Sequence, residues 1–472
     1  MKKTVFTLSI SITAMTLLTA CQSSSFKPAA YQQPEIQSAA QYKYADLQWI
    51  EASKIAATPQ QWWEMYQDPI LSKLIQQLDQ DNLSIQQAQA KYRHAMALLD
   101  GQRANALPSI SMGGNANQTE TKNAGKSRQF GANVAVSWIP DLWGRVAKAV
   151  EGQQANLQAS VADLAAIQLS QQLLTAEAYW SIRLFDAKLD VLNQTKQSDQ
   201  RSVRILQQQY QAGMIAWADV IQAETQLKQV GLQLLELQRS RDLQENVLAV
   251  LVGRNVADFN LNKNRYQFST PQIPTQIPSR LLAQRPDVIR SERELAMTHA
   301  QLGLAQTAWL PDLTISLDSS ANSQVFHSLL QSPNTAWSMG AKVLGTLFDG
   351  GKRQADIQQA QANYDEKLAA YKQSVLTGWK EVEDGLLQAG HFQQQIVAQQ
   401  QLLKLSIENE RVAKQRYQAG LVSYLEVATA QNLRLSAEER LLELQQLQIK
   451  NSAQLIAALG GDINFGSSIR LD

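Results

Sequence analysis

The side chains that could do chemistry are few, and their spacing excludes most kinds of site. The four histidines lie at positions 94, 299, 327 and 391. They show no ligand spacing and have no cysteine beside them, so we expect no metal site. Asp349-Gly350-Gly351 is rich in glycine, but no Gly-Lys-Ser or Gly-Lys-Thr follows, so it predicts a strand-to-helix turn and no phosphate-binding loop. We expect no catalytic residues, no enzyme activity and no cofactor.

Cys21 is the single cysteine of the chain, and its position indicates covalent modification. Lys2 and Lys3 precede an apolar stretch, and residues 1–20 end in Leu-Thr-Ala, as in the signal peptide of a bacterial lipoprotein. In such proteins the cysteine carries diacylglycerol and, after cleavage, an N-acyl chain such as palmitate. We expect this attachment at Cys21. Gln22 follows it in place of Asp, which predicts the outer membrane of a Gram-negative cell.

A second candidate site is a motif that occurs twice. The two stretches are QYQAGMIAWADVIQAE (209–224) and RYQAGLVSYLEVATAQ (416–431). Each places an acid, Asp219 or Glu426, six residues after the glycine of Tyr-Gln-Ala-Gly. The glycines, Gly213 and Gly420, are 207 residues apart. An internal duplication of one structural unit explains this spacing.

The elements that position these motifs follow from the proline pattern. No proline lies between Pro140 and Pro271 or after Pro333, and proline breaks helix interiors. Two long helices are therefore predicted, from Trp143 and Lys352 to the glycines of the repeated motif, each about 100 Å long at 1.5 Å per residue. Shorter helices are expected around them, at roughly 79–107, 218–252, 286–309 and 424–459.

Two inserts rich in Ser, Asn, Gly and Thr carry apolar residues at every second position. In FGANVAVSW (130–138) the apolar face is formed by Phe130, Ala132, Val134, Val136 and Trp138. The same alternation recurs at 109–117, 313–318 and 337–343. The pattern predicts four half-buried strands, as in outer-membrane barrels. Periodicity alone leaves open a soluble pair of hairpins packed on a core.

Four strands cannot close a barrel, since about eight is the smallest number in use. An open sheet edge in lipid leaves backbone groups without partners. The strand count therefore predicts an oligomer, of two chains or of three. Apolar residues every seven positions, at Leu435, Leu442, Ile449 and Ile456, predict coiled-coil packing of the helices. The expected fold class is mainly α with a small β part.

Composition predicts a folded protein. The chain has 472 residues, of which 44% are hydrophobic and 18% charged. Its 43 basic residues nearly balance 42 acidic ones, so nucleic acid is not an expected partner. After the signal peptide no stretch approaches about 20 apolar residues, so any further membrane crossing must use strands.

Several short motifs identify a family when they are taken together. They are WWEMYQDPIL (62–71), DLWGR (141–145), the two YQAG stretches, QRPDV (284–288), LPDLTIS (310–316) and LFDGGKR (347–353). Each alone is a weak signal, but in this order they cover nearly the whole mature chain. The chain resembles the outer membrane factor family of TolC- and OprM-like efflux channels, in its NodT-type lipoprotein branch.

The resemblance implies a homotrimer in which four transmembrane strands per chain complete a twelve-stranded barrel in outer-membrane lipid. A twelve-helix periplasmic α-barrel would continue it as a tunnel. The expected partners are a periplasmic adaptor, or membrane fusion, protein and an inner-membrane transporter of the RND type, while the channel itself is passive.

The resemblance and the repeats together divide the chain. The expected parts are the signal peptide 1–20, a lipid anchor with an N-terminal equatorial segment 21–78, a first repeat 79–252 with its strand insert at about 108–140, a proline-rich equatorial linker 253–285, a second repeat 286–459 with its insert at about 311–347, and a C-terminal tail 460–472.

In this family polar contacts near the helix tips close the periplasmic end. The resemblance places Asp219 at the first-tip acid, Tyr417 at its tyrosine partner and Glu426 at an aperture acid. Thr429 stands where the family has a second aperture acid, and Val422 where it has an arginine that pairs with the first-tip acid. The ring would therefore carry one acid per chain, where three Glu426 carboxylates would attract cations. The tips at Gly213 and Gly420 are the expected adaptor contacts.

The expected function is the passive exit duct of a tripartite efflux pump for drugs and other small toxic compounds. Two alternatives remain open at this stage. A duct of the same architecture could serve protein secretion, or the chain could be a lipid-anchored coiled-coil scaffold without a pore. The alternating inserts favour a duct, because a scaffold has no need of them.

Overall fold

The computed structural model describes residues 30–34, 43, 61–122, 125–264, 266–271 and 285–461. The signal peptide 1–20, Cys21, linker residues 272–284 and the tail from residue 462 lie outside the described residues.

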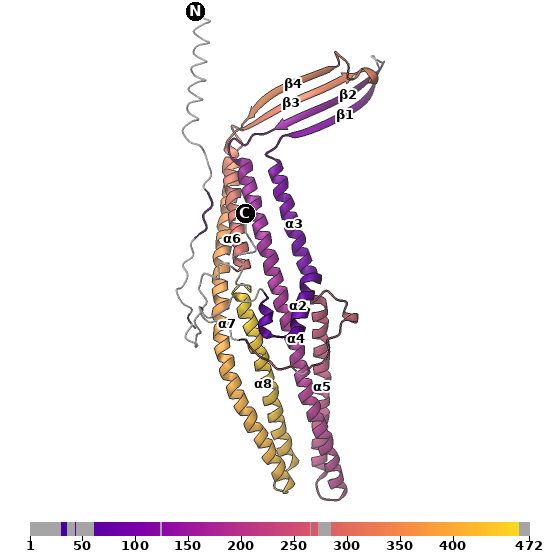
Figure 1. The fold of residues 1–472 in the computed structure, drawn as a ribbon, viewed down its shortest axis with the longest axis vertical. Coiled ribbons are helices and arrows are strands. Elements are labelled where there is room, and N and C mark those ends of the chain that lie inside the picture. The colour runs from indigo at the N-terminus through magenta and orange to yellow at the C-terminus, as the bar shows by residue number, and fades with distance from the viewer. Residues whose placement is uncertain are drawn as a thin grey trace, which may run out of the picture. The chain divides into compact units, whose positions relative to one another are not determined.

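The two repeats form matching pairs of helices (Figure 1). α4 (Arg145–Gln211) and α7 (Lys352–Gln418) each have 67 residues. α5 (Trp217–Leu251) and α8 (Tyr424–Ala458) each have 35. The predicted mainly helical fold, with long helices in the proline-free gaps, is confirmed. In the described part of the chain, no helix combines the length and the apolar character needed to cross a bilayer.

The leading helices are shorter than α4 and α7. α2 (Pro69–Asp81) and α3 (Leu83–Ala104) stand where one helix at 79–107 was expected, and α6 (Pro286–Gln306) is their counterpart. Asn82 causes the break, because its backbone is extended and its side-chain oxygen accepts the N–H of Ile85 at 3.0 Å. Asparagine caps helices in this way. Short 3₁₀ turns occur at η2 (Trp62–Tyr66), η3 (Val256–Asp258), η5 (Thr307–Trp309) and η6 (Phe326–Ser328).

The inserts form one antiparallel sheet in the order β1-β2-β3-β4. Its strands are β1 (Ser109–Thr121), β2 (Gly125–Trp138), β3 (Asp312–Ser323) and β4 (Thr335–Leu344). The register aligns Ile110, Val136, Leu317 and Met339 across all four strands. Paired residues share a face, so the alternating apolar positions collect on one side of the sheet, as predicted.

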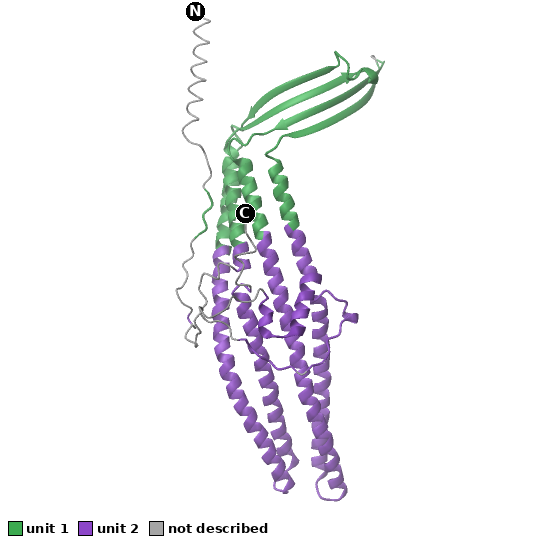
Figure 2. Ribbon diagram, viewed as in Figure 1, with its two compact units in different colours: residues 1–35, 93–159, 291–370 green, residues 36–92, 160–290, 371–472 purple. Residues whose placement is uncertain are grey.

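The described chain divides into two compact units, and each draws on both repeats (Figure 2). Unit 1 holds the sheet and comprises residues 1–35, 93–159 and 291–370. Unit 2 is helical and comprises residues 36–92, 160–290 and 371–472. The units cut across the sequence repeats, so the division of the chain into repeat-based domains stays a prediction.

In unit 1, one arginine joins the start of α4 to the segment that enters β3. The Arg145 guanidinium lies 2.5 Å from the Asp312 carboxylate, and it also donates to the backbone oxygens of Thr307 and Leu310. Trp143 donates its indole N–H to the Pro311 oxygen at 2.7 Å. The DLWGR and LPDLTIS motifs therefore bind each other and fix the direction in which β3 leaves the helices.

In unit 2, the WWEMYQDP motif packs into the core. Trp62 and Trp63 are buried, and the ring of Tyr66 contacts Trp180 of α4 in a tilted arrangement, with centroids 4.9 Å apart. Asp68 caps α2 with one carboxylate oxygen, while the other accepts the Tyr179 hydroxyl at 2.7 Å. The N-terminal segment is thereby attached to the middle of α4.

Gly253 should be intolerant of any side chain. It follows α5 with φ of +69°, and a Cβ there would overlap the backbone carbonyl of Asp81. We expect Gly253→Ala to cost about 1–3 kcal/mol for the backbone conformation alone and to lower the apparent unfolding temperature of the detergent-solubilised protein. Gly231→Ala is the matched control on α5, because no atom lies within 4 Å of the added methyl. Equal melting of both variants would contradict the role of Gly253.

Candidate functional site

The two hairpin tips of unit 2 end their long helices in the same way. Gly213 and Gly420 have φ of +72° and +73°. The Gly213 N–H donates to the Tyr210 oxygen at 2.8 Å, and the Gly420 N–H donates to the Tyr417 oxygen at 2.9 Å. A left-handed glycine after the last turn is the usual stop signal of a helix. Each YQAG motif therefore builds one tip.

The tyrosines of the two motifs connect each long helix to its returning helix. Tyr210 contacts Trp217, with ring centroids 4.9 Å apart, and Tyr417 contacts Tyr424 at 5.6 Å. Trp217 and Tyr424 are the first residues of α5 and α8. The repeat thus reproduces an aromatic pair as well as a turn.

Asp219 of the first tip caps the returning helix of the second. Its carboxylate accepts the backbone N–H of Tyr424 at 3.3 Å. α8 has no side-chain cap of its own, since Ser423 makes no such bond. An acid at a helix N-terminus is favoured by the helix dipole. The contact joins the two hairpins of one chain at their ends.

Tyr417 lies beside this contact without joining it. Its hydroxyl is buried and has no hydrogen-bond partner among the described residues. Burial and the nearby Asp219 carboxylate raise the pKa of Tyr417. The expected pairing of Asp219 with the Tyr417 hydroxyl is not made in the single chain, and its role in closing the tips stays a prediction.

Glu426 has a partner that sequence reasoning did not identify. It accepts a hydrogen bond from Arg416 at 2.7 Å, and both side chains are about half exposed. Arg416 immediately precedes the second YQAG and lies ten residues before Glu426. This spacing across the tip was the one sequence signal that could have suggested the pair. Thr429 donates its hydroxyl to the Leu425 oxygen of its own helix. Arg416 therefore offsets the charge of Glu426, and the expected aperture role of this acid stays a prediction.

Farther along the helices from the tips, polar side chains connect helices of the two hairpins. Gln226 of α5 and Asn432 of α8 exchange two hydrogen bonds, at 2.7 and 3.2 Å. Asp199 of α4 accepts from Gln431 of α8 at 2.6 Å. Burial raises the pKa of Asp199, while the Gln431 bond acts in the opposite direction. No spacing signal singles out these residues, because they lie in glutamine-rich polar stretches.

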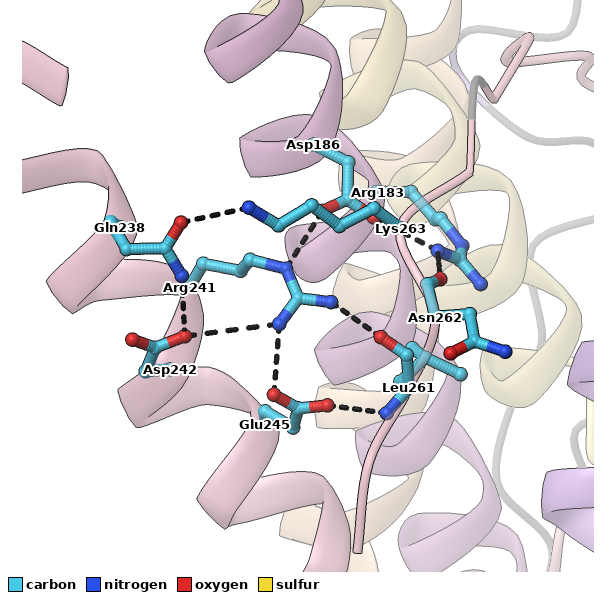
Figure 3. Close-up of polar contacts among 9 residues, drawn as sticks. All are labelled: Arg183, Asp186, Gln238, Arg241, Asp242, Glu245, Leu261, Asn262 and Lys263. Atoms are coloured by element: carbon cyan, nitrogen blue, oxygen red, sulfur yellow. Dashed lines mark hydrogen bonds and ion pairs between the residues drawn. The ribbon is translucent and has the colours of Figure 1, made fainter.

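A larger network holds the segment that follows α5 (Figure 3). Arg241 of α5 binds Asp186 of α4 at 2.7 Å and Glu245 at 2.8 Å. It also donates to the Leu261 oxygen at 2.5 Å, while the Leu261 N–H donates to Glu245. Arg183 of α4 binds Asp186 and donates to the Asn262 oxygen, both at 2.9 Å.

The network is almost fully buried and nearly neutral. The Arg183, Asp186 and Arg241 side chains are at most 4% exposed. Burial acts to lower the pKa of Arg241, but the ion pairs with Asp186 and Glu245 outweigh it and raise this pKa overall. The charges of two arginines and two acids balance, and the linker backbone supplies two further acceptors, the oxygens of Leu261 and Asn262. Two guanidinium nitrogens of Arg183, Nε and Nη2, are buried with no hydrogen-bond partner among the described residues. The described part of linker 253–285 is therefore attached to α4 and α5 by charged side chains.

The apolar face of the sheet is a surface of a different kind. Several of its large side chains are more than 60% exposed, namely Ile110, Met112, Trp337, Met339 and Val343. Contiguous apolar surface of this kind marks contact with a partner or with lipid. Among the described residues, no cluster of His, Cys, Asp and Glu could hold a metal ion.

Comparison with known proteins gives a consistent result. The family model described as "Outer membrane efflux protein" matches residues 74–254 and 277–461. The antibiotic efflux pump outer membrane protein ArpC of Pseudomonas putida is 27% identical over 444 residues, covering 91% of each chain. The toluene efflux pump outer membrane protein TtgC of the same species matches equally well, at 27% over 444 residues and 91% of each chain.

Among solved structures, the outer-membrane channel OprN matches with a TM-score of 0.84 at 23% identity. The match covers 93% of this chain and all of that one. At this identity the likeness establishes the fold, including the four strands and the paired long and short helices.

Arg241→Ala should release the linker. It leaves Glu245 without its cation and Asp186 with Arg183 as its remaining ion-pair partner, and breaking a buried pair costs about 3–5 kcal/mol. We expect a lower apparent unfolding temperature in detergent and faster protease cleavage within residues 253–271. Arg239→Ala is the control, because its pair with Glu236 is exposed and solvent-screened. Unchanged cleavage in Arg241→Ala would show that the linker is held by other contacts.

Proposed function

This chain belongs to the outer membrane efflux protein family, and from that premise we propose that three copies form the passive exit duct of a tripartite pump. It is an outer-membrane component of an efflux system. Beyond this, we infer a trimeric assembly, its partner proteins, and the residues that form the barrel, the gate and the lipid anchor.

The observation that carries the proposal is the four-stranded sheet with one exposed apolar face. Its alternation suits strands that meet lipid on one side and water on the other. Three copies would supply twelve strands, above the smallest number that closes a barrel. Two copies would supply eight, and family membership favours three.

We assign the periplasmic gate to the hairpin tips. Asp219, Tyr417, Glu426 and Thr429 are the gate positions, and Gly213 and Gly420 mark the surfaces that meet the adaptor. Asp219 already joins the hairpins within one chain through the Tyr424 N–H. In a trimer the Glu426–Arg416 pair would set the charge of the aperture, since rings of charged side chains select ions in pores.

Small toxic compounds are the proposed cargo. The two relatives described above are named for antibiotics and for toluene. A periplasmic adaptor would join the tips to an inner-membrane transporter of the RND type, which would supply the work. A channel of this kind needs no catalytic residues of its own, so the chain is proposed to be no enzyme.

The lipoprotein assignment is a separate part of the proposal. Cys21 would carry the diacylglycerol and N-acyl chains that its sequence context predicts, and two or more acyl chains anchor a protein stably. The anchor would add to the hold of the strands in the outer membrane.

Purified protein in planar bilayers should show channel openings. The reversal potential in a KCl gradient measures the relative permeability of the channel to K⁺ and Cl⁻. Glu426→Gln should make the channel less selective for K⁺, and Arg416→Gln should make it more selective for K⁺, because each variant removes one charge of the pair. Unchanged selectivity in both variants would remove Glu426 from the aperture.

A complete absence of openings would contradict the duct and favour the scaffold. Dye retention in a deletion strain, without any secretion defect, would separate efflux from protein export.

Cys21→Ala should abolish labelling by radioactive palmitate, because no other thiol exists in the chain. The measurement is autoradiography of the immunoprecipitated protein. The parent chain is the positive control, and Gln22→Asp should keep the label while moving the protein to the inner-membrane fraction. Continued labelling of Cys21→Ala would refute the lipid attachment at this position.

A further inference from the structure

The two ends of the sheet differ in the charge that they carry. Both hairpins, β1–β2 and β3–β4, turn at the end of the sheet opposite to the one where the strands join their helices (Figure 2). With the helical portion in the periplasm, these turns lie at the outer surface of the outer membrane. The inference below rests on the proposed barrel, in which the apolar face of the sheet meets lipid.

The charged residues near the turns continue the apolar face. Phe130 of β2 belongs to this face, and side chains alternate along a strand, so Arg128 and Lys126 point to the same side. Their partners in β1 are Gln118 and Glu120. The apolar face therefore ends, toward the outside of the cell, in a row of charged and polar side chains.

The opposite face carries no charge at this level of the described strands. Its residues there are Asn117, Thr119, Ser127, Gln129, Ser320 and Asn322. Charges placed only to keep the strand ends soluble would have no reason to avoid the face that lines water. Their restriction to the lipid-facing side indicates a partner on that side.

Positive charge predominates in this row. Lys126 and Arg128 lie on the apolar face, and Lys122 immediately follows β1, against the single acid Glu120. Nearer the helices the apolar face has no charged residue, and Lys342 of β4 lies on the other face, where it pairs with Thr314. The lipid-facing side is thus basic at its outer end only.

The depth of these cations fits one membrane interface. Trp138 ends β2 and lies ten residues beyond Arg128. At about 3.4 Å per residue and a strand tilt of about 35–45°, ten residues cover about 24–28 Å along the membrane normal, and the apolar band of such barrels is about 25 Å tall. With Trp138 in the periplasmic aromatic girdle, Arg128 reaches the headgroups of the outer leaflet.

Both cations have capacity for an external anion. Arg128 donates from Nε to the Gln118 side-chain oxygen at 3.1 Å, and its two other guanidinium nitrogens have no protein partner among the described residues. Lys126 lies 3.7 Å from Glu120, and both side chains are more than 60% exposed, so water screens this pair. Two positions along a strand are about 7 Å apart, so one phosphate group can contact both cations.

Aromatic and aliphatic side chains lie beside the cations. Phe326, in the loop after β3, contacts Phe130 edge-on with ring centroids 5.6 Å apart. It is nevertheless 71% exposed, and Leu330 of the same loop is 78% exposed. A charged headgroup with acyl chains attached matches this combination of exposed cations and exposed apolar side chains.

We propose that Arg128 and Lys126, with Lys122 beside them, bind a phosphate group of the phosphorylated glycolipid of the outer leaflet, while Phe130 and Phe326 contact its acyl chains. A guanidinium group binds phosphate through paired hydrogen bonds, and basic clusters next to a membrane-embedded surface recognise anionic headgroups. A phospholipid of the inner leaflet would need cations near Trp138, where the apolar face has none.

Binding of purified lipid A, the phosphorylated membrane part of this glycolipid, tests the site. Thermophoresis of the full-length protein at a fixed detergent concentration gives the affinity. Arg128→Gln/Lys126→Gln should weaken binding about 25-fold, or fivefold for each charge. Lys342→Gln is the matched control, because it removes a cation from the other face of the same sheet, and it should bind like the parent.

A gain of affinity gives a test that misfolding cannot imitate. Glu120→Gln removes the acid beside Lys126 and should tighten lipid A binding about fivefold. Dephosphorylated lipid A and phosphatidylglycerol should both bind the parent protein more weakly than lipid A does. Equal affinity for lipid A with and without its phosphates would overturn phosphate recognition, and tighter binding of phosphatidylglycerol would overturn the assignment to the glycolipid.

The same preparations separate this site from the proposed duct. Arg128→Gln/Lys126→Gln should keep the channel openings of the parent in planar bilayers made without glycolipid. Openings in the parent together with equal lipid A binding by parent and double variant would overturn the site and leave the duct standing. Charge-dependent lipid A binding by a parent protein that shows no openings would overturn the duct and leave the site standing.

Discussion

Backbone hydrogen bonding at the ends of the sheet is the constraint on which the rest of this structure depends. β1 and β4 satisfy their polar groups on one side only, and neither lipid nor a packed interior tolerates such edges. The helices show the same incompleteness, because Leu232 and Leu235 of α5 and Leu402 and Leu405 of α7 are exposed. Further copies of the same chain could cover both the open strand edges and the exposed apolar residues of the helices, since the duplicated strands and helices already pack against one another within one chain.

Polar contacts between helices fix alignments that apolar packing alone would leave free to slide. Alanine- and glutamine-rich helices pack with little difference between neighbouring registers. The Gln226–Asn432 exchange and the Asp186–Arg241 pair each require one alignment. Buried ion pairs contribute little net stability because desolvation is costly. In this chain these contacts align one helix against another, and they align the linker against α4 and α5.

Sequence patterns predicted the regular elements well. Proline gaps and the YQAG glycines placed the long helices within a few residues, and period-two alternation placed the strands. The break at Asn82 was missed, because a polar residue inside a helical pattern carries no mark of its capping contact with Ile85. Tip contacts were predicted less well. Asp219 was identified, but its contact with the Tyr424 N–H depends on how two distant hairpins meet.

The sequence by itself determined the repeat, the helix and strand types, the family and the single thiol, because these follow from local periodicity and from order along the chain. Only the tertiary structure decided which side chains meet: Arg416 with Glu426, Asp199 with Gln431, and Arg241 with a backbone twenty residues away. Such contacts depend on the relative rotation and register of packed helices. That rotation is set by many weak packing contacts at once, and no single stretch of sequence records it.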